Sequence, residues 1–152
     1  MKNLLNVIIV LLITCSSALA QSSEHENSVK FVIDKMFQGM VKGDSSVVHQ
    51  TLQKKCVLKT VLRKKDGTTV IIDEPVQAFL DHVGKPINEK IEERLLSYDI
   101  KIDADMAMAW TPYQFYIADK LSHCGVNVFM LARQDSGWKI ISITDTRRKD
   151  CK

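Results

Sequence analysis

The chain has 152 residues, of which 45% are hydrophobic and 26% are charged, and its formal net charge is +3. This is the composition of an ordinary globular domain. The net charge of the chain is small and its basic residues are scattered, whereas a nucleic-acid-binding domain presents a basic stripe. The sequence therefore disfavours nucleic-acid binding.

The first 20 residues, MKNLLNVIIVLLITCSSALA, have the three parts of a secretory signal peptide. Lys2 precedes an apolar run over residues 4–13, and small residues stand at 18–20. The run is shorter than the roughly 20 residues that span a bilayer. We therefore expect cleavage before Gln21 and export to the periplasm or the medium. The remaining 132 residues, with a net charge of +2, fit one domain.

Cysteine positions set two further expectations. Cys15 offers lipid anchoring as the alternative to a soluble exported protein, although Thr14 is a poor residue before an anchoring cysteine. Cys56, Cys124 and Cys151 remain in the mature chain, so at least one thiol is free or intermolecular. No C-x-x-C occurs, which disfavours a redox motif or a zinc ribbon.

A polar leader over residues 21–27 is followed by a helical pattern. Its apolar positions have the spacing of one helical face: Val29, Val32, Ile33, Met36, Phe37, Met40 and Val41. Gly43 is placed to end this helix, and Asp44 is placed to cap a short second one.

The pattern then changes to strands. Asp66-Gly67 separates two apolar runs within residues 56–72, which predicts a β-hairpin. A third helix is expected next, with Asp73 as its cap, Pro75 in its first turn and Gly84 at its end.

Four more strands are predicted over residues 91–103, 106–118, 121–133 and 137–147, with turns at Asp119-Lys120 and residues 134–137. The predicted order is α-α-β-β-α-β-β-β-β, in one domain over residues 28–149 with a tail over 150–152.

Four segments carry a resemblance to a known superfamily: GMVKGDSSVVHQTL at 39–52, AW at 109–110, SHCGVNVF at 122–129 and GWKIISITDTRR at 137–148. Across residues 27–149 the chain resembles the nuclear transport factor two-like superfamily, which includes ketosteroid isomerases and SnoaL-like cyclases. Within it, the sequence is most similar to exported bacterial lumazine-binding-like proteins. The resemblance implies a cone-shaped, cystatin-like α+β roll, in which a strongly bent mixed sheet wraps around the helices and leaves a cavity.

The resemblance also implies a homodimer, because many members pair through the outer face of the sheet. It implies a pocket more strongly than a reaction, because function varies widely over this fold. We do not infer from this resemblance that lumazine is the ligand of this chain.

A tight turn at Asp119-Lys120 would pair residue 116 with 123 and residue 110 with 129. One face then collects aromatic area and polar tips, the composition of a small-molecule pocket: Trp110, Gln114, Tyr116, His123, Asn127 and Phe129. The alternatives are that Trp110 belongs to the core, that His123 only bonds backbone or water at a hairpin end, and that neighbouring strands satisfy Asn127.

His123 and Asp145 are the candidate catalytic residues. Histidine titrates near neutral pH, and a carboxylate base would suit an isomerase or dehydratase of this fold. Asp145 has a second interpretation as half of a rim ion pair with Arg147. A second interpretation of Arg147 is that its guanidinium group, together with that of Arg94, binds an anionic ligand.

Other chemistries find no support in the pattern. Ser122 and His123 are adjacent in a strand and point to opposite faces, so they do not form a nucleophile and its base. The histidines lack metal-ligand spacing and no glycine-rich phosphate loop occurs, so we expect neither a metal nor a cofactor.

A disulfide between Cys124 and Cys151 would clip the tail onto the sheet and add about 3–4 kcal/mol on the chain-entropy account.

Three functions follow from these observations. The leading one is an exported protein that binds a small, partly apolar ligand in the cavity. The alternatives are a cofactor-free isomerase, cyclase or dehydratase, and an envelope protein-interaction domain.

Overall fold

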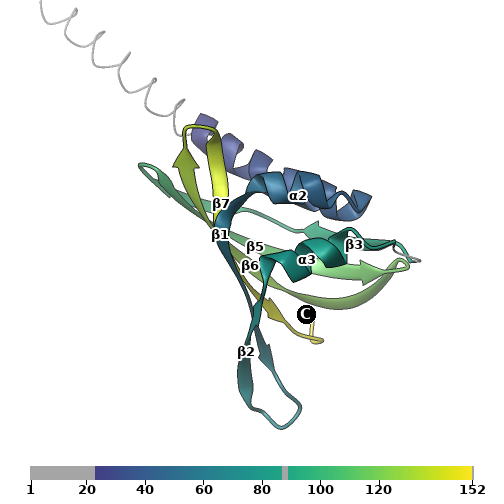
Figure 1. Ribbon diagram of the computed structural model, residues 1–152. Coiled ribbons are helices and arrows are strands. Elements are labelled where there is room, and N and C mark those ends of the chain that lie inside the picture. The colour runs from purple at the N-terminus through teal and green to yellow at the C-terminus, as the bar shows by residue number, and fades with distance from the viewer. Residues whose placement is uncertain (1–22, 87–88, 152) are drawn as a thin grey trace, which may run out of the picture.

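Three helices cover one face of a curved seven-stranded sheet in the computed structural model, which describes residues 23–86 and 89–151 (Figure 1). The predicted signal peptide and Cys15 lie outside the described residues. Residues 23–27, expected as part of a polar leader, are already helical. Among the described helices, none combines the length and apolar character needed to cross a bilayer.

The first helix, described over 23–42, buries Val29, Ile33 and Met36 against the sheet. Gly43 follows with a φ of 66°, the left-handed conformation that glycine adopts without strain. Asp44 then caps α2 (Ser45–Thr51), because its carboxylate accepts a hydrogen bond from a backbone N–H in the first turn. The predicted corner between the two helices is confirmed.

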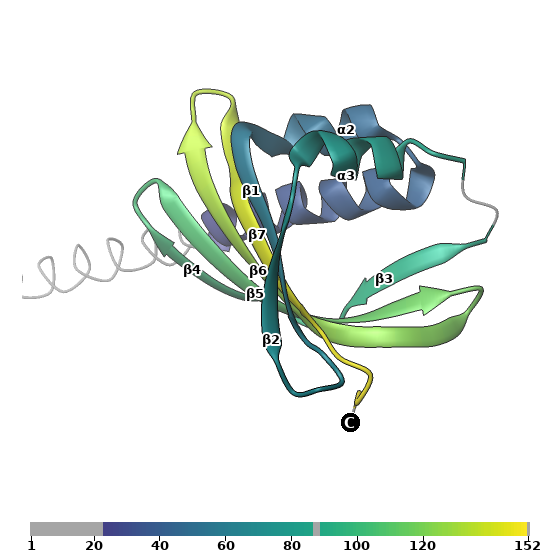
Figure 2. The ribbon, with the colours of Figure 1, turned by 60° about the horizontal axis from the view of Figure 1, so that its bottom comes forward.

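The sheet is mixed, as expected. Its strands are β1 (Leu52–Arg63), β2 (Thr69–Glu74), β3 (Ile91–Leu95), β4 (Asp99–Asp103), β5 (Met106–Ile117), β6 (Lys120–Gln134) and β7 (Gly137–Arg147). Their order is β2-β1-β7-β6-β5-β3, with β4 on the same edge of β5 as β3, and only the β1–β7 pair is parallel. Figure 2 shows the long β5 and β6 curving beneath the helices.

Two details differ from the sequence prediction. The segment 91–103 is two strands, and between them Tyr98 donates a hydrogen bond to Asp34 of the first helix. The helix α3 (Val76–Val83) has Pro75 at its N-cap position, while Asp73 belongs to β2. The prediction of Asp73 as a cap was therefore wrong.

The β5–β6 turn lies one residue earlier than predicted. Ala118 and Asp119 form it with φ values of 47° and 61°, typical of a type I′ hairpin turn, and Ile117 pairs with Lys120.

A β-bulge at Ser122 then changes the register of this hairpin. Leu121 pairs with Tyr116, Ser122 has no partner residue on β5, and His123 pairs with Phe115. The predicted pairing of 116 with 123 was wrong because of the earlier turn and this bulge together. Because one inserted residue reverses which side chains share a face, the bulge decides what surrounds His123.

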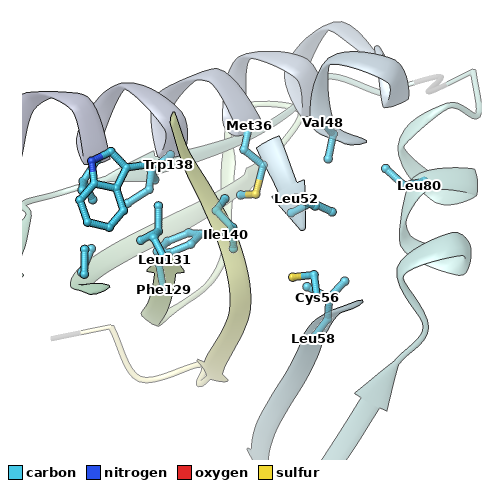
Figure 3. Packing of buried hydrophobic residues seen from close by; sticks show 14 of the residues in the cluster. Met36, Val48, Leu52, Cys56, Leu58, Leu80, Phe129, Leu131, Trp138 and Ile140 are labelled. Atoms are coloured by element: carbon cyan, nitrogen blue, oxygen red, sulfur yellow. The ribbon is translucent and has the colours of Figure 1, made fainter. Parts of the chain in front are cut away.

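The core lies between the helices and the concave face of the sheet (Figure 3). Phe37 of the first helix meets Phe129 edge to face, with ring centroids 6.1 Å apart. Buried apolar side chains from every layer join them: Met36, Val48, Leu52, Cys56, Leu58, Leu80, Leu131, Trp138 and Ile140.

Cys124 and Cys151 form a disulfide, as predicted. Among the residues that the structure describes, Cys56 is a free cysteine, and it is buried. The bridge fastens the tail beside β6, where Cys124 and Arg148 also exchange two backbone hydrogen bonds.

Candidate functional site

A partly open cavity of about 420 Å³ lies between the helices and the concave face of the sheet. One wall is apolar and includes aromatic and sulfur-containing side chains: Met36, Phe37, Met40, Phe79, Phe129 and Ile143. Polar side chains from β1, β3, β6 and β7 gather at the other end. The cavity therefore offers both apolar area and hydrogen-bonding groups to one small molecule.

Asp145 is the centre of the polar end. It lies beside Thr60 across the parallel β1–β7 pair, and it accepts hydrogen bonds from Thr60 Oγ1 and, at 2.8 Å, from Arg147 Nε. Tyr113 approaches its second oxygen at 3.4 Å. The carboxylate is thus held by Thr60 and Arg147, and its side chain is 13% exposed.

Glu93 of β3 reaches the same end of the cavity. Asn127 Nδ2 donates a hydrogen bond to Glu93 Oε1 at 2.7 Å. Burial raises the pKa of Glu93 to about 7, the negative charge of Asp145 adds to the increase, and the Asn127 hydrogen bond and the Arg147 charge oppose it. A carboxyl group with this pKa can both take up and release a proton near neutral pH.

His123 stands against aromatic rings at the cavity wall. Its ring stacks on Phe115 with centroids 4.8 Å apart and meets Tyr113 edge to face at 5.8 Å. Burial lowers the pKa of His123, and the positive charges of Arg147 and Lys149 lower it further. The neutral imidazole is therefore favoured.

Tyr113 is held in place by the backbone of the last two strands. Its hydroxyl donates to the carbonyl oxygen of Thr146 at 2.9 Å, and its ring packs on Gly125. A Cβ at Gly125 would lie 1.8 Å from that carbonyl oxygen and 2.7 Å from the Tyr113 ring. The pairing of Gly125 with Tyr113 is regular, so the glycine marks no bulge here, and this close approach explains it.

The architecture matches solved structures at low sequence identity. One is an NTF2-like protein with a cystatin-like fold from Novosphingobium aromaticivorans, with a TM-score of 0.70, 10% identity and coverage of 88% of each chain. The chain has the nuclear transport factor two-like fold.

Two further structures support this fold. An NTF2-like protein of unknown function from Shewanella baltica has a TM-score of 0.63 and 14% identity over 84% of this chain and 97% of its own. A candidate dehydratase of the NTF2-like family from Streptomyces avermitilis has a TM-score of 0.62 and 13% identity over 84% of this chain and 98% of its own. No protein-family model matches the sequence, and no curated protein matches it.

The nuclear transport factor two-like roll brings four of the residues singled out in the sequence to the cavity: His123, Asn127, Phe129 and Asp145. Arg147, considered as a ligand fork or a rim ion pair, lies there too and makes the ion pair with Asp145. Asn127 has a hydrogen-bond partner on another strand, Glu93 of β3, and Glu93 itself lies at the cavity.

Three of the predicted pocket residues lie on the opposite, outer face of the sheet. Trp110 is 47% exposed there and belongs neither to the cavity nor to the core. The Arg94 guanidinium lies 4.1 Å from the centre of the Tyr116 ring and pairs with Glu92. The Ser122 bulge explains the errors for Trp110 and Tyr116, while Arg94 points outward because its neighbour Glu93 points inward.

Glu93 was missed by the sequence reasoning, although a signal was present. Ile91, Glu93 and Leu95 alternate along β3, so Glu93 occupies a position on the apolar face of that strand. A carboxyl group between two inward apolar residues indicates a buried acid, and such acids concentrate at functional sites.

Within residues 23–86 and 89–151, no three histidine, cysteine, aspartate or glutamate side chains are arranged to hold a metal ion.

Proposed function

We propose that this protein binds a small, partly apolar ligand in the cavity between its helices and its sheet. The observation that carries the proposal is the cavity of about 420 Å³ with an apolar wall at one end and converging polar groups at the other. Its volume is within the range of small-molecule sites. An interaction domain with a vestigial pocket would instead fill this space with side chains.

The test is native mass spectrometry of the protein purified from its own host, which would detect a co-purified small molecule. Ile143→Trp would fill the cavity, and Leu96→Trp adds the same side chain at a position that is 60% exposed. We expect the bound mass to be lost from the first variant and kept by the second. Equal retention by both would contradict binding in this cavity.

A second candidate function is proton transfer in a cofactor-free isomerase, cyclase or dehydratase. Glu93 favours it, because a carboxyl with a pKa of about 7 inside a cavity is suited to general acid–base catalysis. The fold likeness to the candidate dehydratase from Streptomyces avermitilis is consistent with it. In this role Glu93 would move the proton, and His123 would be a second group within the same cavity.

This enzymatic role can be tested with a panel of ketones in deuterium oxide, in which NMR follows exchange of the protons beside the carbonyl. We expect exchange by the unmodified chain and loss in Glu93→Gln. Exchange that survives this substitution would remove Glu93 from the role.

We also propose a homodimer formed through the outer face of the sheet. The exposed apolar side chains of Val57, Met106 and Trp110, each 45–50% exposed on strands of this sheet, support this proposal. Analytical ultracentrifugation should give a dimer for the unmodified chain and for Phe31→Arg, a control on the first helix, and a monomer for Trp110→Arg. A monomeric unmodified chain would overturn the proposal.

Export guided by residues 1–20 remains part of the proposal, with the periplasm or the medium as destination and anchoring through Cys15 as the alternative. The Cys124–Cys151 disulfide supports export, because disulfides persist mainly in oxidising compartments. Intact mass of the protein from its host distinguishes a cleaved chain that begins at Gln21 from a lipidated one.

A further inference from the structure

The hydrogen-bonding groups at the polar end of the cavity differ in how freely they can bind a ligand. Asp145 already accepts hydrogen bonds from Thr60 and Arg147. The Tyr113 proton is directed to the Thr146 carbonyl oxygen at 2.9 Å. The Tyr113 hydroxyl proton is therefore not open to a ligand without loss of an internal hydrogen bond, and Asp145 has no proton to donate while it is ionised.

Arg147 is the open charged donor. Its side chain makes one ion pair with the described residues, through Nε to Asp145, and it is 50% exposed. The two terminal nitrogens carry four more N–H groups. They lie at the cavity lining, where a planar guanidinium can bind two oxygens of a carboxylate at once.

Basic groups act on His123 at this wall of the cavity. At His123 the effects of Arg147 and Lys149 both exceed the opposing effect of Asp145. Lys149 is fixed there by its hydrogen bond to the carbonyl oxygen of Ser122 at 2.7 Å. An anion at this wall meets Arg147, which lines the cavity, whereas Arg147 would repel an ammonium group.

We propose that the ligand is an amphipathic organic acid, whose carboxylate binds the terminal nitrogens of Arg147 and whose apolar body lies against Met36, Phe37 and Phe129. This inference rests on the proposed ligand-binding function and specifies its chemistry. The carboxylate would lie near Glu93, whose Oε1 already accepts from Asn127 and whose second oxygen is left for the ligand.

The position of Glu93 links binding to protons. A protonated Glu93 donates its O–H to the ligand carboxylate, whereas an ionised Glu93 repels it, so the affinity should fall as the pH rises through about 7. Other titratable or charged groups at the same cavity are Lys59, Glu74, His82, Tyr113, His123, Asp145 and Arg147. Of these, Asp145 and Arg147 act on Glu93 with opposite signs.

Two matched sets of probes test the proposal on the full chain: octanoate, 1-octanol and octylamine, and 2-naphthylacetic acid, 2-(2-naphthyl)ethanol and 2-(2-naphthyl)ethylamine. In both sets the acid and the amine keep their charges between pH 6 and pH 8.5. Calorimetry at pH 6 should give an affinity for the acid about tenfold above that for the alcohol, and a lower affinity for the amine. Octanoate or the naphthyl acid should bind less tightly at pH 8.5.

Three variants separate the contributions. Arg147→Gln should bring the acid to the affinity of the alcohol, and Arg94→Gln, on the outer face, should change nothing. Glu93→Gln should bind the acid with no pH dependence over this range. If Arg147→Gln does not fold, Arg147→Lys replaces it, and it should bind the acid more weakly than the unmodified chain while still preferring it to the amine.

The outcomes distinguish this inference from the function on which it rests. Binding of the alcohol or the amine as tightly as the acid overturns the organic-acid proposal and leaves ligand binding intact. If no member of either set binds, both fall.

Discussion

Replacing Glu93 with Gln should stabilise the protein at alkaline pH. The unfolded carboxyl ionises with a pKa near 4.5, whereas burial and Asp145 hold the pKa of the folded one at about 7. Between these values the folded chain binds a proton that the unfolded chain has lost, so stability falls as the pH rises. At 1.36 kcal/mol for each tenfold change, the cost is about 3 kcal/mol once both states are ionised.

Urea unfolding at pH 5 and pH 8.5 measures this cost. The amide oxygen introduced by Glu93→Gln can still accept the hydrogen bond from Asn127, so this variant should match the unmodified chain at pH 5 and exceed it by about 3 kcal/mol at pH 8.5. Glu92→Gln is the control, because Arg94 lowers the pKa of Glu92 and its replacement gains nothing in this window. Parallel pH profiles for the Glu93→Gln and unmodified proteins would refute the reasoning.

Three more predictions concern the frame of the site. Replacing Cys124 and Cys151 with Ser should lower the free energy of unfolding by about 3.5 kcal/mol for a separation of 27 residues, and a loss below about 1 kcal/mol in denaturant would contradict the chain-entropy account. Gly125→Ala should cost about 3 kcal/mol or more in thermal unfolding, since its Cβ would lie 1.8 Å from a carbonyl oxygen of β7; a neutral effect would mean that the strands separate easily. Asn127→Leu should raise the pKa of Glu93 above about 7 in an NMR titration, because it removes a hydrogen bond to the carboxylate; an unchanged midpoint would exclude that contribution.

Local chemistry explains which parts of the fold could be predicted from the sequence. Gly43 and Asp44 form the corner between two helices because a left-handed residue and a side-chain cap are needed there and few residues supply them. The hairpin at Asp66-Gly67 and the end of α3 at Gly84 follow in the same way. Each of these signals acts over a few residues and needs no knowledge of the rest of the chain.

The cavity residues are brought together by long-range strand pairing, so fewer of them could be predicted from the sequence. Asp145 and Arg147 could be assigned to one face because they are two positions apart in one strand. Their meeting with Thr60 depends on the parallel β1–β7 pair, which joins distant segments and has no local signature. Glu93 could have been recognised from the alternation along β3, but its contact with Asn127 again depends on the sheet.

The hairpin of β5 and β6 shows why a small local error moved whole side chains. Placing the turn at Ala118-Asp119 rather than one residue later shifts the pairing by two positions, which leaves every side chain on its predicted face. The bulge at Ser122 adds a single position, and a single position reverses the faces. His123 and Asn127 consequently lie with Tyr113 and face the cavity, and Trp110 is left on the outer face. A serine bulge has no strong sequence signal, so deletion of Ser122 is a direct probe of the assigned register. Because Leu121 is opposite Tyr116 and His123 is opposite Phe115, the deletion should close the ladder without moving His123 or Asn127 from the cavity face, and loss of the cavity site in a folded variant would contradict this register.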